Sequence, residues 1–146
     1  MTDASAQVAP AASFINPEAV HRPFGYTHVV EVTAGRPVYI SGQVALDREG
    51  ELVGPGDVRA QARQVFENLQ AGLQAVGASF DQVVKLNYYL LDITQLPAVR
   101  EVRDQYVNTA RPPASTAVEV RRLAVDGLLI EVEAVAVITE DGGPDR

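Results

Sequence analysis

The strongest constraint on the fold is the apolar segment 128–138, which has the sequence LLIEVEAVAVI. Its β-branched residues predict a β-strand, in which successive side chains point to opposite faces. One face would carry Ile130, Val132, Ala134, Ala136 and Ile138. The other face would carry Leu129, Glu131, Glu133, Val135 and Val137. Because both faces are mostly apolar, both must be covered. Helices of so short a chain can cover one face, and the simplest cover for the second is another subunit.

Four further segments complete the prediction of strands. Segments 28–32 and 37–46 are β-branched and aromatic, and the breaker sequence AGRP between them favours an antiparallel pair. Segment 81–91 alternates between apolar and polar side chains, and segment 116–123 reads as the strand before the last one. Asp-Gly at 126–127 would join the last two strands.

Two helices are predicted between these strands. Apolar residues recur at a spacing of 3.6 between Asp57, a suitable N-cap, and Gly77, which can end the helix. A second helix would start at Thr94 as N-cap and tolerate Pro97 in its first turn. The order β-β-α-β-α-β-β predicts an α+β fold in which one sheet carries both helices on one face.

Composition limits the function. The chain has 146 residues, so it fits one domain at 14–139, between flexible tails at 1–13 and 140–146. With 12 basic and 19 acidic residues, the net charge of −7 argues against nucleic acid and anionic membranes as partners. The absence of cysteine excludes disulfides, thiolate metal sites and a cysteine nucleophile. Residues 1–13 lack a basic start and an apolar stretch, which predicts a cytoplasmic protein.

Three places in the sequence are candidate site positions. Glu131 lies in the middle of an apolar strand, where a carboxylate needs a partner or serves as an acid or base. The alternative is that it alternates into solvent or pairs with an arginine. Ser41-Gly42 interrupts a good strand, which indicates either a packing bulge or a close approach to a ligand. Tyr26 precedes the first strand and either packs there or lines a site.

No motif for a metal or cofactor is present. The sequence contains no glycine-rich phosphate loop, HExxH or GxSxG pattern. His21 and His28 lie in different local contexts, which favours surface or interface positions over a metal pair. We therefore expect neither a metal nor a cofactor.

Taken together, five blocks in order resemble the Rid family, the reactive intermediate deaminases of the RidA/YjgF type. The blocks cover most of residues 24–138 and read YTHVVEV, VYISGQVALDREGELV, DVRAQARQVFENLQAGLQAVGASFDQVVKLNYYLLD, RPPASTAVEV and IEVEAVAV. The resemblance implies a chorismate-mutase-like α+β fold and a homotrimer whose sheets face inward as a barrel-like core. It also implies small-molecule sites in the clefts between subunits.

The resemblance also implies an activity and a set of site residues. Active Rid enzymes hydrolyse enamines and imines to 2-oxo acids and ammonia. A glutamate activates water, and it corresponds to Glu131. Tyr26, Ser41 and the adjacent Gly42 match the residues that shape the pocket.

Three positions depart from the pattern of the active family members. The arginine that binds the substrate carboxylate is Ser115 here, the usual cysteine two residues later is Ala117, and a helix asparagine is Arg100.

The change from arginine to serine affects the predicted substrate. A guanidinium binds a carboxylate bidentately, whereas a serine hydroxyl offers one neutral donor. Removing one partner of a buried charge pair costs about 2–5 kcal/mol. Either Arg100 or Arg111 replaces the lost cation, or the substrate has no carboxylate.

Three functions follow from the resemblance. The first is a hydrolase acting on a small imine, enamine or related C–N compound, with Glu131 as the base. The second is a non-enzymatic trimer that binds a metabolite in the same clefts. The third and weakest is an endoribonuclease, which the net charge of −7 disfavours.

Overall fold

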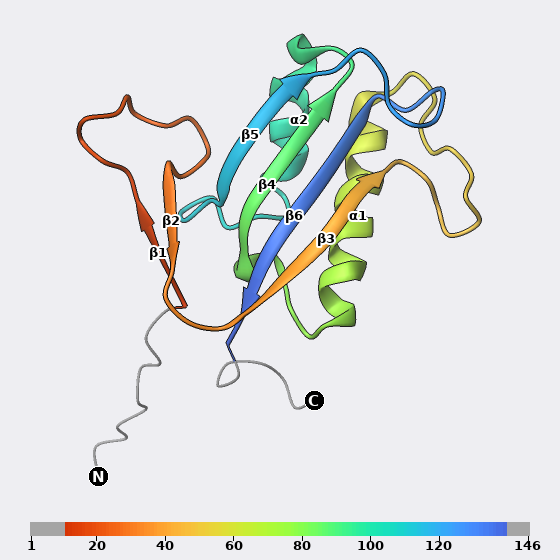
Figure 1. The fold of residues 1–146 in the computed structure, drawn as a ribbon. Helices are drawn as coiled ribbons and strands as arrows, with labels where there is room; N and C mark the ends of the chain where they lie inside the picture. The colour runs from red at the N-terminus through yellow and green to blue at the C-terminus, as the bar shows by residue number, and fades with distance from the viewer. Residues whose placement is uncertain (1–10, 140–146) are drawn as a thin grey trace.

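In the computed structural model, which describes residues 11–139, two helices cover one face of a mixed four-stranded sheet (Figure 1). The strand order is β3-β6-β4-β5, with β3 and β4 both antiparallel to β6, and β5 parallel to β4. The bounds are β3 Arg36–Val44, β4 Val83–Leu90, β5 Ala114–Glu119 and β6 Ile130–Ile138. The predicted α+β class, with both helices on one face, is confirmed. The predicted tails 1–13 and 140–146 lie mostly outside the described residues.

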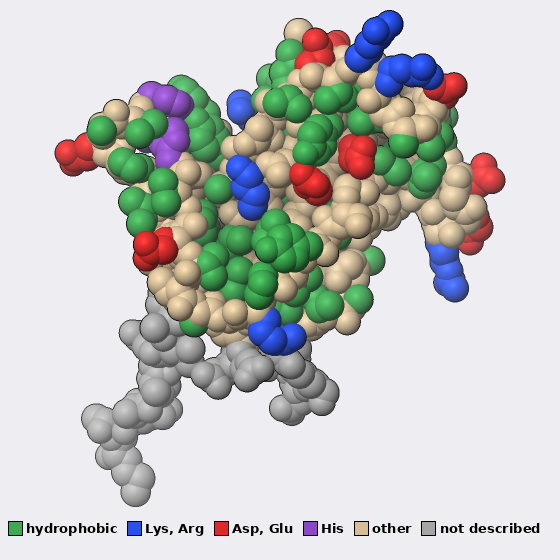
Figure 2. Space-filling model, viewed as in Figure 1, with side chains coloured by type: hydrophobic (Ala, Val, Ile, Leu, Met, Phe, Trp, Pro, Cys, Tyr) green, Lys and Arg blue, Asp and Glu red, His purple; other side chains and the backbone are tan. Residues whose placement is uncertain are grey.

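The alternation of β6 is as the sequence predicts. Its five residues that face the helices are at most 5% exposed: Ile130, Val132, Ala134, Ala136 and Ile138. Glu131, Glu133 and Val135 point to the other face and are half-buried. We call this other side of the sheet the open face. In Figure 2, which is viewed from this side, acidic side chains lie over the middle of the sheet, with hydrophobic side chains below them.

Helix α1 (Val58–Ala75) forms where its periodicity predicts it. The side chain of Asp57 accepts hydrogen bonds from the backbone N–H groups of Arg59 and Ala60. Its buried stripe includes Val65, Phe66 and Leu69, all with no exposed area. Helix α1 therefore supplies most of the buried side chains that the two helices contribute to the core.

Helix α2 (Leu96–Arg103) differs in detail from the prediction. A 3-10 turn, Ile93–Gln95, precedes it, and the side chain that caps this turn is that of Asp92 instead of Thr94. Pro97 lies in the first turn of α2, as predicted. Tyr106 lies beyond the end of the helix, but its ring stacks on Phe66 at 5.3 Å between centroids.

The predicted pairing of segments 28–32 and 37–46 is wrong. Strand β2 (Val29–Val32) pairs with β1 (Ala12–Ile15), and β3 pairs with β6. Strand β1 begins inside the predicted tail 1–13. The β1–β2 hairpin packs Ala12 against Val84 and Val137, so it covers one end of the open face. The apolar strand β6 offers β3 a longer ladder than the four-residue β2 can.

The last two strands, which the segment with Asp126-Gly127 connects, are not neighbours in the sheet. Strand β5 pairs with β4 alone, and β6 lies between β3 and β4. Strand β5 is therefore an edge of the sheet, and β3 is the opposite edge. Within the described residues, no helix is long and apolar enough to cross a membrane.

A buried glutamine fixes the loops at one end of the sheet. Gln61 on α1 has no exposed area, and its amide donates to the carbonyls of Gly54 and Gly127. Its carbonyl oxygen accepts from the backbone N–H of Leu129, one residue before β6. Gln61 thus ties α1 to the start of the strand that carries the glutamates.

We expect Gln61→Leu to lower the free energy of unfolding by about 1–3 kcal/mol, because it leaves backbone groups without partners. Urea denaturation at a fixed protein concentration measures the change. Gln74→Leu, on the exposed side of α1, is the control. Equal stability of the two variants would contradict the role of Gln61.

Candidate functional site

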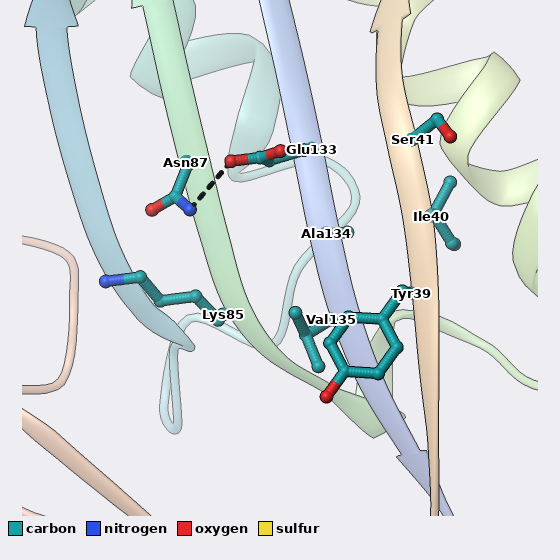
Figure 3. Close-up of a pocket in the computed structure, with 8 residues that line it drawn as sticks. All are labelled: Tyr39, Ile40, Ser41, Lys85, Asn87, Glu133, Ala134 and Val135. Carbon is teal, nitrogen blue, oxygen red and sulfur yellow. Dashed lines mark hydrogen bonds between the residues drawn. The ribbon is translucent and has the colours of Figure 1, made fainter.

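A hollow of about 300 Å³ lies on the open face between β3, β6 and β4. Its polar side chains are those of Tyr39, Ser41, Lys85, Asn87 and Glu133 (Figure 3). Tyr39 is 78% exposed, so its aromatic ring leaves a large apolar area on the surface of a monomer. This hollow lies on the open face, which must be covered because both faces of β6 are mostly apolar.

Glu133 is held in place by two side chains from β4. Oε1 of Glu133 accepts from Nδ2 of Asn87 at 3.0 Å and from the hydroxyl of Tyr89 at 2.7 Å. The hydrogen bond from Tyr89, followed by the one from Asn87, holds the pKa of Glu133 below its ordinary value. The same bond raises the pKa of Tyr89. Glu133 is therefore a fixed anion and a weak base.

Glu131 lies in a different environment on the same strand. It is half-buried, and the register places it between Val44 of β3 and Tyr89 of β4. Among the described residues, no side chain or backbone group makes a hydrogen bond to its carboxylate. Its carboxylate is thus free to accept a proton from a ligand or from water.

Gly42 makes room for this carboxylate. The ladder between β3 and β6 is irregular between Ile40 and Gln43, so Ser41 and Gly42 form the predicted bulge. A Cβ atom at Gly42 would lie 2.1 Å from Oε1 of Glu131, closer than any side chain allows. The bulge therefore brings the β3 backbone at Gly42, one residue after the exposed Ser41, next to Glu131.

Ser115 and Ala117 lie on the opposite face of the sheet. They align with Leu86 and Tyr88 of β4, which are buried on the helix side. Both belong to the edge strand β5 and are half-buried. They therefore do not share a face with Glu131 within one subunit.

Tyr26 lies near the start of β5. The neighbouring residue Thr27 donates its backbone N–H to the carbonyl of Pro113 and its hydroxyl to that of Pro112. The ring of Tyr26 meets His28 edge-on, at 5.3 Å between centroids. The loop that holds Tyr26 is thus fastened to the chain just ahead of Ser115.

The two arginines that could replace the lost cation lie apart. Arg100 is on α2, in the helix layer, where its charge acts on the hydroxyl of Tyr88. Arg111 lies over the ring of Phe14 at 5.0 Å and lines a hollow beside β1. Neither lies in the hollow beside Glu133 on the open face.

One subunit thus divides the predicted site residues into two groups. Ser41 and Gly42 on β3 and Glu131 on the adjacent β6 form one group, and Tyr26 and Ser115 lie at the β5 edge. Three strand spacings, about 14 Å, separate β3 from β5, and two spacings, about 10 Å, separate β6 from β5. The two groups also face opposite sides of the sheet, so they cannot contact one small ligand within a single chain.

Comparison with known proteins shows the family of the chain. The family model described as endoribonuclease L-PSP matches residues 17–138. A RutC family protein of Pyrococcus abyssi is 39% identical over 128 residues, which are 86% of this chain and 97% of that protein. A solved structure from Yersinia pestis, described as a conserved Rid family protein of unknown function, has a TM-score of 0.79 at 36% identity. It covers 88% of this chain and is itself covered completely. The chain belongs to the Rid family.

Some of the relatives carry an activity in their names. The 2-iminobutanoate/2-iminopropanoate deaminase of Capra hircus is 40% identical over 107 residues, or 73% of this chain and 76% of that protein. The described part of this Rid family member contains no group of three or more histidine or acidic side chains that could hold a metal ion.

The sequence analysis did not identify the cluster around Glu133. The alternation of segment 81–91 put Lys85, Asn87 and Tyr89 on one face, which was the available signal. Only the pairing of β4 with β6 shows that Asn87 and Tyr89 lie beside Glu133. Lys85 extends to the other neighbour, where its ammonium donates to the hydroxyl of Thr116 at 3.1 Å.

We expect Tyr89→Phe to raise the pKa of Glu133, because it removes the main hydrogen bond to the carboxylate. The folded pKa of Glu133 is depressed, so its contribution to stability is full above pH 4.5 and is lost as the pH falls through the folded pKa. The stability difference between wild type and Tyr89→Phe should therefore shrink in acid.

Carbon-13 NMR titration of the glutamate carboxyls and urea unfolding at neutral and acid pH measure these effects. Tyr39→Phe is the matched control, because the exposed Tyr39 hydroxyl makes no hydrogen bond with any described residue. An unchanged Glu133 pKa in Tyr89→Phe would contradict the assignment.

Proposed function

We propose that this chain is a Rid-type hydrolase that acts on a small imine or enamine in clefts between identical subunits. The observation that carries the proposal is the carboxylate of Glu131, which lies against the Gly42 bulge without a hydrogen-bond partner among the described residues. Membership of the Rid family and the deaminase name of a relative support the reaction class.

The reaction needs little from the protein besides one base. Water adds to the carbon of the C=N bond while Glu131 accepts a proton from the water. The nitrogen takes up a proton, the C–N bond breaks, and the products are a carbonyl compound and ammonia. Glu133 is less suited to this role, because the hydrogen bonds from Asn87 and Tyr89 already engage its carboxylate.

The division of the site residues supports assembly into a ring. One group lies on β3 and the adjacent β6 and the other at the β5 edge, so the β5 edge of one subunit must approach the β3 side of the next. Such head-to-tail contacts close into cyclic oligomers. Three copies would also cover the open faces, as the resemblance implies for the family.

A non-enzymatic metabolite-binding trimer is the second candidate. Ser115 favours it, because a serine does not replace the charge and fork geometry of an arginine. Ribonuclease activity, which the description of the family model names, is a weaker candidate, because a net charge of −7 repels a phosphate backbone.

We expect light scattering to give about three times 15.7 kDa, because the open face of β6 and both sheet edges need partners. The measurement should be repeated over a range of protein concentrations. A monomer at all concentrations would contradict the placement of the site between subunits.

We expect Glu131→Gln to reduce imine hydrolysis by about 10²–10⁴-fold, the usual effect of losing a general base. An amino-acid dehydratase that releases 2-iminobutanoate, coupled to ammonia detection, measures the rate. Glu49→Gln, in an exposed loop, controls for charge.

The same experiment separates the two main candidates. A variant that keeps the trimer and its ligand but loses turnover supports the hydrolase. Loss of the trimer in Glu131→Gln alone would make Glu131 an interface carboxylate and favour the binding protein.

A further inference from the structure

Arg103, the last residue of α2, is a buried cation that the proposed reaction does not use. Its side chain is 8% exposed, whereas that of its partner Asp104 is 47% exposed. Nε and Nη2 of Arg103 both donate to Oδ1 of Asp104, at 2.9 and 2.7 Å. Because the carboxylate stays half in solvent, a part of the protein other than the ion pair must cover the guanidinium.

The loop that carries Tyr26 lies against this guanidinium at Gly25. A Cβ atom at Gly25 would be 2.6 Å from Nη2 of Arg103 and 3.3 Å from both Cζ and Nη1. The flat end of the guanidinium thus lies across the place that a side chain would take. Gly25 also has a φ of +72°, which glycine adopts without strain. The close contact and the backbone angle therefore both require glycine here.

Contacts on both sides of Tyr26 hold this loop. Phe24 is 70% exposed, so burial of its ring does not anchor the loop. On the far side of Tyr26, Thr27 is 2% exposed and donates its backbone N–H to Pro113 and its hydroxyl to the carbonyl of Pro112. Tyr26 therefore lies between two anchors, which are Gly25 on Arg103 and Thr27 on the chain ahead of β5.

Arg103 is itself held rigidly, so it can serve as such an anchor. Its backbone carbonyl accepts hydrogen bonds from the N–H groups of Tyr106 and Val107, in the turn that ends α2. Its two hydrogen bonds to one oxygen of Asp104 fix the plane of the guanidinium. A lysine would keep the charge but lacks this planar group. The flat surface under Gly25 therefore depends on arginine.

We propose that Arg103 is a positioning residue, which supports Gly25 and thereby holds Tyr26 in place at the β5 edge. This inference rests on the proposed function, in which Tyr26 of one subunit lines a cleft with Glu131 of the next. Arg103 acts through the loop and does not touch the ligand. A side chain that is fixed before the ligand arrives lowers the entropic cost of binding. A loop with an exposed Phe24 would lack that order without its two anchors.

The first test measures the order of the loop and does not depend on turnover. Amide hydrogen exchange of residues 24–27 is followed by mass spectrometry in the intact protein without ligand. We expect Arg103→Met to speed this exchange by about 10-fold, because the loop then opens locally while the core stays folded. Arg59→Met is the control, because Arg59 forms an exposed ion pair with Glu101. Unchanged exchange in Arg103→Met would overturn the proposal and make Arg103 an ion-pair partner only.

Arg103→Lys keeps the test decisive if Arg103→Met does not fold. It retains a cation for Asp104, so the urea midpoint should stay near that of wild type, yet the loop amides should exchange about 10-fold faster. Gly25→Ala should also free the loop, and by less in the Arg103→Lys background, where the clash with Nη2 is gone. Wild-type exchange in Arg103→Lys, or equal effects of Gly25→Ala in both backgrounds, would overturn the proposal.

The second test asks whether Arg103 acts through Tyr26. We expect Arg103→Lys to slow ammonia release from 2-iminobutanoate by about 10–100-fold, the usual effect of a misplaced site residue, and to have little further effect in Tyr26→Ala. A simple loss of folded protein would lower the rate by the same factor in both backgrounds and would overturn the positioning role. A wild-type protein that releases no ammonia would remove the hydrolase, while the exchange measurements would still decide whether Arg103 holds the loop.

Discussion

The alternation of β6 determines where every acidic group of the site can lie. The strand is bonded on both edges, to β3 and to β4, so its register is fixed along its whole length. A slip by one residue would move Glu131 and Glu133 into the buried apolar layer between the sheet and the helices. It would also expose Ile130 and Val132. Burial of apolar side chains against α1 therefore also holds both carboxylates on the open face.

The same strand gives its two glutamates different chemistry. Glu133 accepts two hydrogen bonds from β4, which stabilise its charged form and make it a poor proton acceptor. Glu131 lies at the irregular end of the β3 ladder, where Gly42 replaces a side chain with open backbone. The carboxylate of Glu131 therefore keeps free lone pairs, whereas that of Glu133 is engaged. The bulge, at which Ser41 and Gly42 leave the β3 ladder, thus lies beside the carboxylate that makes no hydrogen bond with the described residues.

Local periodicity made much of this fold predictable from the sequence, and contacts between distant segments account for the errors. The stripe of α1 and the two faces of β6 depend on spacing within one element, and both predictions are confirmed. The partner of β2 could not be read in this way, since a four-residue strand can pair with any neighbour of suitable length. The burial of Gln61 and Arg103 depends on loops that contact them from elsewhere in the chain. The sequence identified candidate residues such as Ser115 by their position in the chain. The face of the sheet on which they lie could be known only from the register between β5 and β4.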